Sequence, residues 1–544
     1  MQGHSAGQVA TTFGYSQGGF ESMVRDFRAG DREFFVARRR GPKSAPAKDA
    51  ARGRIVQLRQ GGHSIDEIAA ALRAEGTPLN RTGISEVIKD EGFDRLWRRP
   101  ETARGGPRRE NLARAKVIDF TALPEQCETK LAGLLLMVPD LVALDLPALV
   151  DAAGYPGTSA IPAASSVLSL LALKLVGTRR VSHVEDLAAD PGAALFAGLA
   201  ALPKATALTS YSYRLSHERQ RRFLAALDAA LLRTGLAEGG DFDLDFHAVM
   251  HWGEDLALEK HYVPRRSQRT RSVLTFFAQD AGTHNLVYAN ADLSKATQAR
   301  EVLAFCDHWK QAIGTDPKTL VLDQRVTTHD VLAELDTRGI RFITLRMRSV
   351  ALQRHIDAAD PGAWGTVTLD RAGRYRKPQV IDETVHITNY PNQVRQLLVR
   401  GLGHDSPTVI ITNDHTSTAK KIIERYARRM TIEQRLAEAI RAFHLDSLAG
   451  AVPLNVDLDV VLSVLAGNLC AALRRRLGTG YTTATPDTLQ RRFLHTGGQI
   501  LNTAAGITVR LDRRTYSPVL RQADLPAATT VPWWGNRTLR FEYA

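Results

Sequence analysis

The sequence has few of the features that mark several large classes of protein. It contains three cysteines in 544 residues, and no two of them form a C-x-x-C pair. A disulfide framework or a cysteine zinc site is therefore not expected, and this cysteine usage favours a reducing cytoplasm. A Walker A motif is absent, which argues against the common phosphate-binding loop of nucleotide hydrolases.

Long apolar runs are also scarce. The most apolar stretch, residues 131–150, is interrupted by two prolines and two aspartates, whereas a membrane-spanning helix needs about 20 consecutive apolar residues. The first residues lack the basic start and apolar core of a secretory signal. The sequence therefore predicts neither a membrane span nor a signal peptide.

Acidic residues are fewer than basic ones: 58 Asp and Glu stand against 71 Lys and Arg, a net charge of +13. The first 120 residues alone hold 22 Lys and Arg against 15 Asp and Glu. Such an excess attracts polyanions, and without a membrane span nucleic acid is the favoured partner. A composition of 44% hydrophobic and 24% charged residues is that of a globular chain, long enough for several domains.

Composition and hydrophobic periodicity predict an all-α first half. Two basic segments that contain proline or glycine, residues 38–50 and 101–120, are expected to be linkers. They delimit two helical units, residues 1–37 and 51–100, each predicted to be a helix-turn-helix. Residues 121–240 carry Leu- and Ala-rich runs separated by turns and are predicted to form a helical domain.

The second of these units has the clearer pattern. Ser64 and Glu67 form a capping box that opens one helix, and a further helix is predicted over residues 82–90. This arrangement suits a reader of the DNA major groove, with exposed candidates and a basic tail for DNA contact: Arg81, Ser85, Lys89, Arg98 and Arg99. The alternative is that this unit is a small helical bundle that mediates protein contacts, and that its basic residues only face solvent.

From residue 241 onward the periodicity changes to that of strands. Three strands are expected within residues 241–292, followed by helix, strand, helix and strand within residues 296–347. This β-β-β-α-β-α-β order predicts a mixed sheet with helices on its faces. The fold class expected for the whole chain is therefore multidomain, with all-α units followed by an α/β domain.

Three acids lie at positions where a sheet of this kind usually carries its functional residues. Asp245 is the last acid of the first, alternating strand, and Asp323 closes a short apolar strand. A long helix over about residues 417–443 carries Tyr426, Arg429 and Glu433 along one stripe. Carboxylates that converge from two strands and a helix are typical Mg²⁺ ligands for phosphoryl transfer. A helix cap or a surface ion pair is the alternative for each acid by itself.

These motifs resemble those of the DDE-type transposases of bacterial insertion sequences, enzymes with a ribonuclease-H-like catalytic domain. The resemblance covers about residues 240–445 and rests on three segments: LDFH at 244–247, LVLDQRVTTHDVLAEL at 320–335 and YARRMTIE at 426–433. It implies that Asp245, Asp323 and Glu433 are the catalytic and metal-binding triad, which holds two Mg²⁺ ions that Mn²⁺ can replace.

The resemblance also implies DNA contacts around the triad. Tyr426 and Arg429 match family positions that contact the phosphates of the cleaved DNA end. The family's next position in this helix is a lysine, but the chain has Ile440 there, so the neighbouring Arg441 is the expected substitute. Arg346 and Arg348 follow the fifth strand and are candidates for contact with the DNA end. The alternative is that they belong to an ordinary solvated surface.

The spacing of the triad predicts an insertion. The interval from Asp245 to Asp323 is 78 residues and that from Asp323 to Glu433 is 110, longer than a plain strand-and-helix path needs. We therefore expect a β-rich insertion at residues 349–406 within a catalytic domain formed by residues 241–348 and 407–447. A C-terminal helical segment and a small β appendage are expected over residues 448–544.

The function expected from these features is DNA transposition in a bacterial cytoplasm, close to the nucleoid. Such an enzyme binds the terminal inverted repeats of an insertion sequence, cuts strands and joins them to target DNA in a Mg²⁺-dependent reaction. Two ends must be brought together, so a homodimer in a synaptic complex is expected. The alternatives are a non-catalytic DNA-binding regulator and a metal-dependent nuclease of the same fold.

Overall fold

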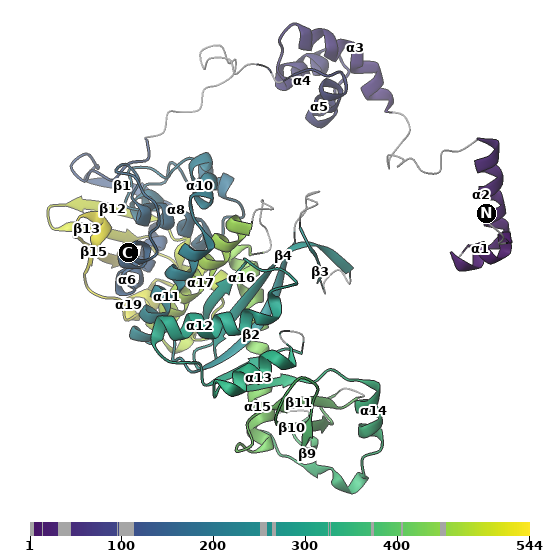
Figure 1. Ribbon diagram of the computed structural model, residues 1–544. Helices are drawn as coiled ribbons and strands as arrows, with labels where there is room; N and C mark the ends of the chain where they lie inside the picture. Colours follow the sequence, from purple (N-terminus) through teal and green to yellow (C-terminus); the bar gives the residue numbers. More distant parts are fainter. Residues whose placement is uncertain are drawn as a thin grey trace. The chain divides into compact units, whose positions relative to one another are not determined.

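The computed structural model forms two compact units, Met1–Arg109 and Glu110–Ala544 (Figure 1). The structure describes residues 5–13, 15–30, 45–94, 96, 114–250, 258–263, 268–324, 326, 328–370, 375–403, 406–445 and 453–543.

The first unit is helical over its described residues. Helices α1 (Ala6–Thr12) and α2 (Gln17–Ala29) come first, and Ser16 caps α2 by accepting a hydrogen bond from the backbone N–H of Gly19. The left-handed Gly30 ends α2. The polar cap and the glycine stop are the local signals that define this helix.

Helices α3 (Pro46–Gln60), α4 (Ile65–Ala74) and α5 (Arg81–Asp90) pack around a small apolar core that includes Ile55, Ile68 and Ile84. The capping box predicted at Ser64 and Glu67 is present, because each side chain bonds the other's backbone N–H. The last residues of the linker expected over residues 38–50 are helical. Proline suits the first turn of a helix, where no N–H donor is required, so α3 already begins at Pro46.

The second unit begins with the predicted helical region. Its helices are η2 (Ala132–Met137), α6 (Val138–Ala143), α7 (Leu146–Ala152), α8 (Ala163–Leu175), η3 (Val181–Asp186), α9 (Pro191–Phe196), α10 (Ala205–Tyr211), η4 (Ser212–Arg214) and α11 (His217–Arg233). The end of the linker expected over residues 101–120 belongs to this unit, because Val117 forms a β-bridge with Leu199.

A strand in this region departs from the all-helical prediction. Strand β1 (Gln126–Thr129) pairs antiparallel with β12 (Gly498–Thr503), more than 300 residues further along the chain. Four residues carry no periodicity that would distinguish a strand, and only the distant partner satisfies their backbone.

The chain's C-terminal part completes that sheet. Its order is β1-β12-β13-β15-β14. The elements are α17 (Pro453–Leu477), η8 (Thr479–Tyr481), α18 (Pro486–Leu489), the π-helix η9 (Gln490–Leu494), β12, β13 (Gly506–Leu511), α19 (Ser517–Gln522), β14 (Thr529–Val531), η10 (Pro532–Trp534) and β15 (Arg537–Tyr543). The indole of Trp534 donates a 2.8 Å hydrogen bond to the carbonyl of Leu195, which ties this sheet to α9.

Helix α17 is the central core helix of this unit (Figure 1). Its segment Asn455–Leu477 is long and apolar enough to cross a membrane, and the bent pair Ala132–Ala143 and Leu146–Ala152 passes the same test together. However, 89% of the apolar window of α17 is buried inside the fold, which is the burial of a core helix.

The larger sheet carries the candidate site. Its order is β3-β4-β2-β6-β7-β11-β10-β9-β8, with β5 paired to β4. The first strands are β2 (Asp241–Met250), β3 (Lys260–Val263), β4 (Gln268–Asp280), β5 (Leu286–Asn290), β6 (Thr319–Leu322) and β7 (Arg341–Leu345), with η6 (Gln298–Arg300), α12 (Glu301–Ile313) and α13 (His329–Thr337) between them. Strands β2, β6 and β7 are mutually parallel, whereas β4 is antiparallel to β2 and β5. The predicted mixed sheet is therefore confirmed.

The insertion extends this sheet. Its elements are α14 (Val350–Asp357), η7 (Pro361–Ala363), β8 (Gly365–Thr366), β9 (Gln379–His386) and β10 (Gln393–Arg400), and β11 (Thr408–Thr412) follows. Strand β11 pairs antiparallel with β7 and continues the sheet to β10, β9 and β8. The predicted strands therefore form there, as a continuation of the larger sheet and together with a helix.

The predicted long helix over residues 417–443 is two helices, α15 (Ala419–Arg428) and α16 (Met430–Phe443). At Arg429 two backbone hydrogen bonds span three residues instead of four. The N–H of Arg429 donates to the carbonyl of Tyr426, and the N–H of Ile432 donates to the carbonyl of Arg429. Periodicity alone did not indicate this break, because Arg429 keeps helical backbone angles and both helices follow the same sequence period.

Candidate active site

Strand alternation puts the aspartates on one face of the sheet. Phe242 of β2 packs against Trp309 of α12, with ring centroids 4.5 Å apart. Since successive side chains alternate between faces, Asp243 and Asp245 point to the opposite face. The buried apolar side chains on that face include Val321 of β6 and Ile423 of α15.

The register of two parallel strands brings Asp245 and Asp323 to the same level. Leu244 of β2 lies opposite Leu322 of β6 in the last pair of this ladder. Asp245 is the next residue of β2, and Asp323 is the first residue after β6. Asp245 lies in the middle of its strand, because β2 continues to Met250 through its pairing with β4.

Glu433 reaches the same place from the first turn of α16, and Arg429 stands between the three acids. Nη1 of Arg429 is 3.5 Å from Asp245, and Nη2 is 3.9 Å from Asp323 and 2.8 Å from Glu433. Only the contact with Glu433 is a hydrogen bond. The three acids predicted from the sequence are therefore brought together, around a guanidinium that the sequence assigned to DNA.

Burial within this cluster is uneven. The side chain of Arg429 is 8% exposed and that of Asp245 is 17% exposed, whereas Asp323 and Glu433 are 44% and 52% exposed. The site thus has one deep carboxylate and two that face solvent, an arrangement in which a large substrate can approach the outer two.

The three carboxylates lie close together, and their negative charges repel one another. Burial, together with the nearby carboxylates of Asp323 and Glu433, raises the pKa of Asp245 to about 6, while Arg429 opposes the shift. The pKa of Arg429 is raised, since attraction to the acids outweighs the effect of its burial.

Tyr426 lies at the edge of this cluster. The Arg429 guanidinium carbon is 6.0 Å from the Tyr426 ring centroid, at the limit of a cation–π contact. Burial raises the pKa of the Tyr426 hydroxyl to about 12, so this group stays protonated and can donate a hydrogen bond at neutral pH.

A second ion pair lies beneath the triad and was not predicted. The fully buried Asp243 accepts a 2.6 Å hydrogen bond from Nη1 of Arg425. Burial raises the pKa of Asp243 although Arg425 opposes this. Residues 425, 429 and 433 are spaced by four, so the helical stripe that carries Arg429 and Glu433 could have revealed Arg425 as well.

The donor set of the triad fits a divalent cation in its chemistry. Hard cations bind carboxylate oxygens, and three carboxylates with one guanidinium leave two negative charges. However, within the described ranges no group of three or more His, Cys, Asp or Glu side chains is close enough to enclose an ion. Arg429 stands between the acids, so ion binding requires a local rearrangement.

The predicted DNA contacts around the triad have different environments. Arg348 and Arg441 are exposed. Arg346 is half-buried and its Nη1 donates a 2.5 Å hydrogen bond to Gln396, so it is engaged within the sheet. Burial also lowers the pKa of Arg346.

In the first unit, the predicted contact residues on α5 are all exposed: Arg81, Ser85 and Lys89. Arg81 forms an ion pair with Asp66 of α4. The predicted basic contacts Arg98 and Arg99 lie outside the described residues.

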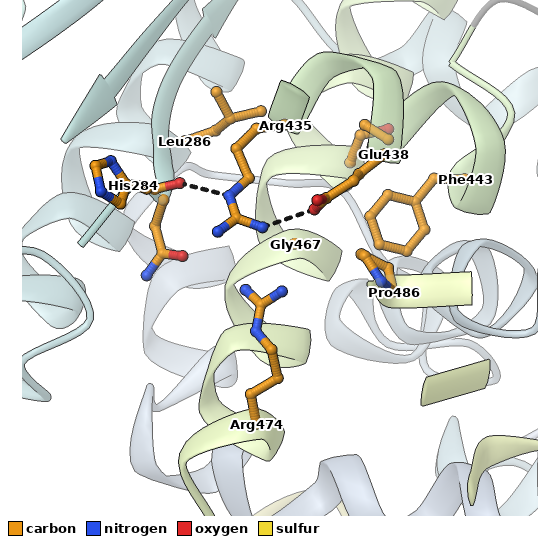
Figure 2. Close-up of a pocket in the computed structure, with 11 residues that line it drawn as sticks. His284, Leu286, Arg435, Glu438, Phe443, Gly467, Arg474 and Pro486 are labelled. Carbon is orange, nitrogen blue, oxygen red and sulfur yellow. Dashed lines mark hydrogen bonds and ion pairs between the residues drawn. The ribbon is translucent and has the colours of Figure 1, made fainter. Parts of the chain in front are cut away.

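A small cavity of about 30 Å³ lies on another side of α16 (Figure 2). Arg435 donates from Nη1 to Glu438 at 2.7 Å and from Nε to the carbonyl of His284 at 3.2 Å, and Arg474 points toward the same space. A volume of about 30 Å³ suits a water molecule and no substrate. These contacts hold α16 against the β4–β5 hairpin and so support the position of Glu433.

Comparison with known proteins agrees with the location of the acids. Residues 227–468 match the family model of the transposase DDE domain, a range from α11 to α17 that includes all three acids. A solved structure of a piggyBac transposase synaptic complex with hairpin DNA matches at 8% sequence identity and a TM-score of 0.36, covering 70% of this chain and 82% of that chain. No curated protein matches the chain.

Proposed function

The chain contains a transposase DDE domain over residues 227–468, and from this premise we propose that it is a DNA transposase of a bacterial insertion sequence. The proposal is that it binds terminal inverted repeats, cleaves DNA strands and joins the freed ends to target DNA. The observation that carries it is the convergence of Asp245, Asp323 and Glu433 on one guanidinium.

The fold around the acids supports a ribonuclease-H-like assignment. Strand β4 pairs antiparallel with both β2 and β5, and β6 and β7 then join parallel to β2 with α12 and α13 between the strands. The acids lie at neighbouring positions of two central parallel strands and on a helix that packs over the same face.

In the proposed reaction, Asp245, Asp323 and Glu433 would hold two Mg²⁺ ions, with Mn²⁺ as a substitute. When bound, such ions lower the pKa of a water or 3′-hydroxyl nucleophile and neutralise charge on the phosphate under attack. The carboxylate of Asp245 lies on the buried side of the site, and the more exposed Asp323 and Glu433 would face the DNA. The Tyr426 hydroxyl and the Arg429 guanidinium orient phosphate oxygens by hydrogen bonding.

DNA recognition is assigned to the first unit. Helices α3, α4 and α5 would form a helix-turn-helix, with the exposed Arg81, Ser85 and Lys89 directed at the DNA. Helices α1 and α2 would form a second such element. The net charge of +7 carried by the first 120 residues supports this role. Pairing of two transposon ends would require a homodimer, in the cytoplasm and close to the nucleoid.

The proposal is tested with the full chain, DNA that contains the terminal repeats flanking its gene, and Mg²⁺. Asp323→Asn is expected to bind this DNA with unchanged affinity and to reduce strand cleavage at least about a thousandfold, since an amide is a poorer ligand for a hard cation. Asp151→Asn, at an exposed position on α7, is the matched control and should cleave normally. Cleavage retained by Asp323→Asn would remove this residue from the triad.

The products separate the proposed function from the two alternatives. Joined products identify a transposase. Nicked products without joining identify a nuclease of the same fold, and specific binding with neither product under Mg²⁺ or Mn²⁺ identifies a DNA-binding regulator.

A further inference from the structure

Arg429 has an environment that a purely DNA-binding arginine would not need. Its guanidinium is more than nine-tenths buried and lies within 4 Å of three carboxylates. Its Nε–H and Nη1–H groups nevertheless make no hydrogen bond in the structure. The guanidinium is thus held among the acids chiefly by charge, and the nitrogens that carry three of its five N–H donors make no hydrogen bond.

From this arrangement we propose that Arg429 is an internal counter-ion of the acidic site, which a divalent cation displaces on binding. The inference rests on the proposed function and adds that cation binding releases Arg429 from the acids. Without a cation, Arg429 neutralises part of the negative charge and holds Asp245, Asp323 and Glu433 together. A divalent cation among the same oxygens repels the guanidinium, so both cannot occupy the space between the acids.

The position of Arg429 in the chain permits this exchange. It lies at the break between α15 and α16, where the regular helical bonds are interrupted. The side chain has a long aliphatic stem, and the adjacent Tyr426 ring offers a surface for the guanidinium within cation–π range.

The exchange has a consequence for DNA binding. A guanidinium released from the acids presents paired N–H donors that match the oxygens of a phosphate. Cation loading and the exposure of a phosphate-binding group would then be one event. An empty site would keep Arg429 turned inward and would engage a cleaved DNA end less tightly.

The test is direct cation binding, measured from the electron paramagnetic resonance signal of free Mn²⁺ with the full chain and no DNA. Arg429→Gln is expected to bind Mn²⁺ about tenfold more tightly or better than the unsubstituted protein, because the competing positive charge is gone. Arg428→Gln removes the same charge from the exposed neighbouring position and should change the affinity less than twofold.

Arg429→Lys is a second variant, which keeps the test decisive if Arg429→Gln does not fold. Lysine keeps one positive charge but cannot span three carboxylates, so an intermediate Mn²⁺ affinity is expected. Equal or weaker Mn²⁺ binding by both Arg429 variants, with normal circular dichroism, would overturn the exchange and leave the proposed transposase function intact. If the unsubstituted chain and Arg429→Gln both fail to bind Mn²⁺, the metal-binding triad itself is wrong, and the exchange with it.

Discussion

Asp243 and Arg425 form a buried ion pair that fastens α15 to β2 directly beneath the three acids. The Nη1–Oδ1 distance is 2.6 Å, and the side chains are 1% and 16% exposed. Oδ2 of Asp243 and the Nε and Nη2 groups of Arg425 have no hydrogen-bond partner. The pair therefore depends on one strong contact, and its loss would leave a charge uncompensated in the core.

The first prediction concerns this pair. Arg425→Met is expected to lower the free energy of unfolding by about 3 kcal/mol, because Asp243 is left as an unpaired buried carboxylate. The double variant Asp243→Asn with Arg425→Met should recover most of the loss. Thermal unfolding followed by circular dichroism measures both. Equal stability of the single and double variants would show that the pair does not fasten the helix to the strand.

The second prediction is a dependence on pH. The pKa of Asp245 is about 6 in the folded protein and about 3.9 in an unfolded chain. The folded state therefore binds this proton more tightly, and the ionised carboxylate costs stability above pH 6. As the pH falls from 6 towards 4, the contribution of this group to stability rises.

Asp245→Asn should accordingly stabilise the protein by about 3 kcal/mol at pH 7.5 in the presence of a chelator, and by almost nothing at pH 4. The backbone N–H of Phe246, which bonds Oδ1 of Asp245 at 2.8 Å, keeps an acceptor in the amide. Thermal unfolding at the two pH values, with Asp151→Asn as the control, checks this. A stabilisation that does not vary with pH would contradict it.

The third prediction separates the two units. Deletion of residues 1–109 is expected to leave the unfolding temperature of the second unit unchanged, because that unit has its own core, and to weaken specific binding to terminal-repeat DNA at least about a hundredfold. Deletion of residues 1–120 should also lower the unfolding temperature, since it removes the Val117–Leu199 bridge and the Phe120–Trp534 ring contact. Identical unfolding of the two truncated chains would contradict the assigned boundary.

The fourth prediction concerns packing within the second unit. A Cβ atom at Gly133 would lie 1.9 Å from the backbone oxygen of Phe493. Gly133→Ala must therefore separate η2 from η9, and we expect a loss of about 3 kcal/mol or more. A Cβ atom at Gly467 in α17 would have no neighbouring atom within 4 Å, so Gly467→Ala should gain up to about 1 kcal/mol from helix propensity. Thermal unfolding of both variants measures the contrast.

Local sequence determined much of this protein. Ser16 and the Ser64–Glu67 capping box define helix starts through contacts within a few residues. The alternation of residues 241–245 determines that Phe242 and Asp243 lie on opposite faces of a strand. The order of strands and helices around Asp245 and Asp323 follows from patterns of the same short range, and so do the two aspartates as candidate ligands.

The tertiary structure decided the relationships between distant segments. The pairing of β1 with β12, the continuation of the larger sheet through β11, and the position of Arg429 among three acids join residues that no periodicity relates. Backbone hydrogen bonds in a sheet carry no residue code, so a short strand finds its partner only when the whole core forms. The charge balance of the site likewise depends on distances of a few ångströms, which only packing determines.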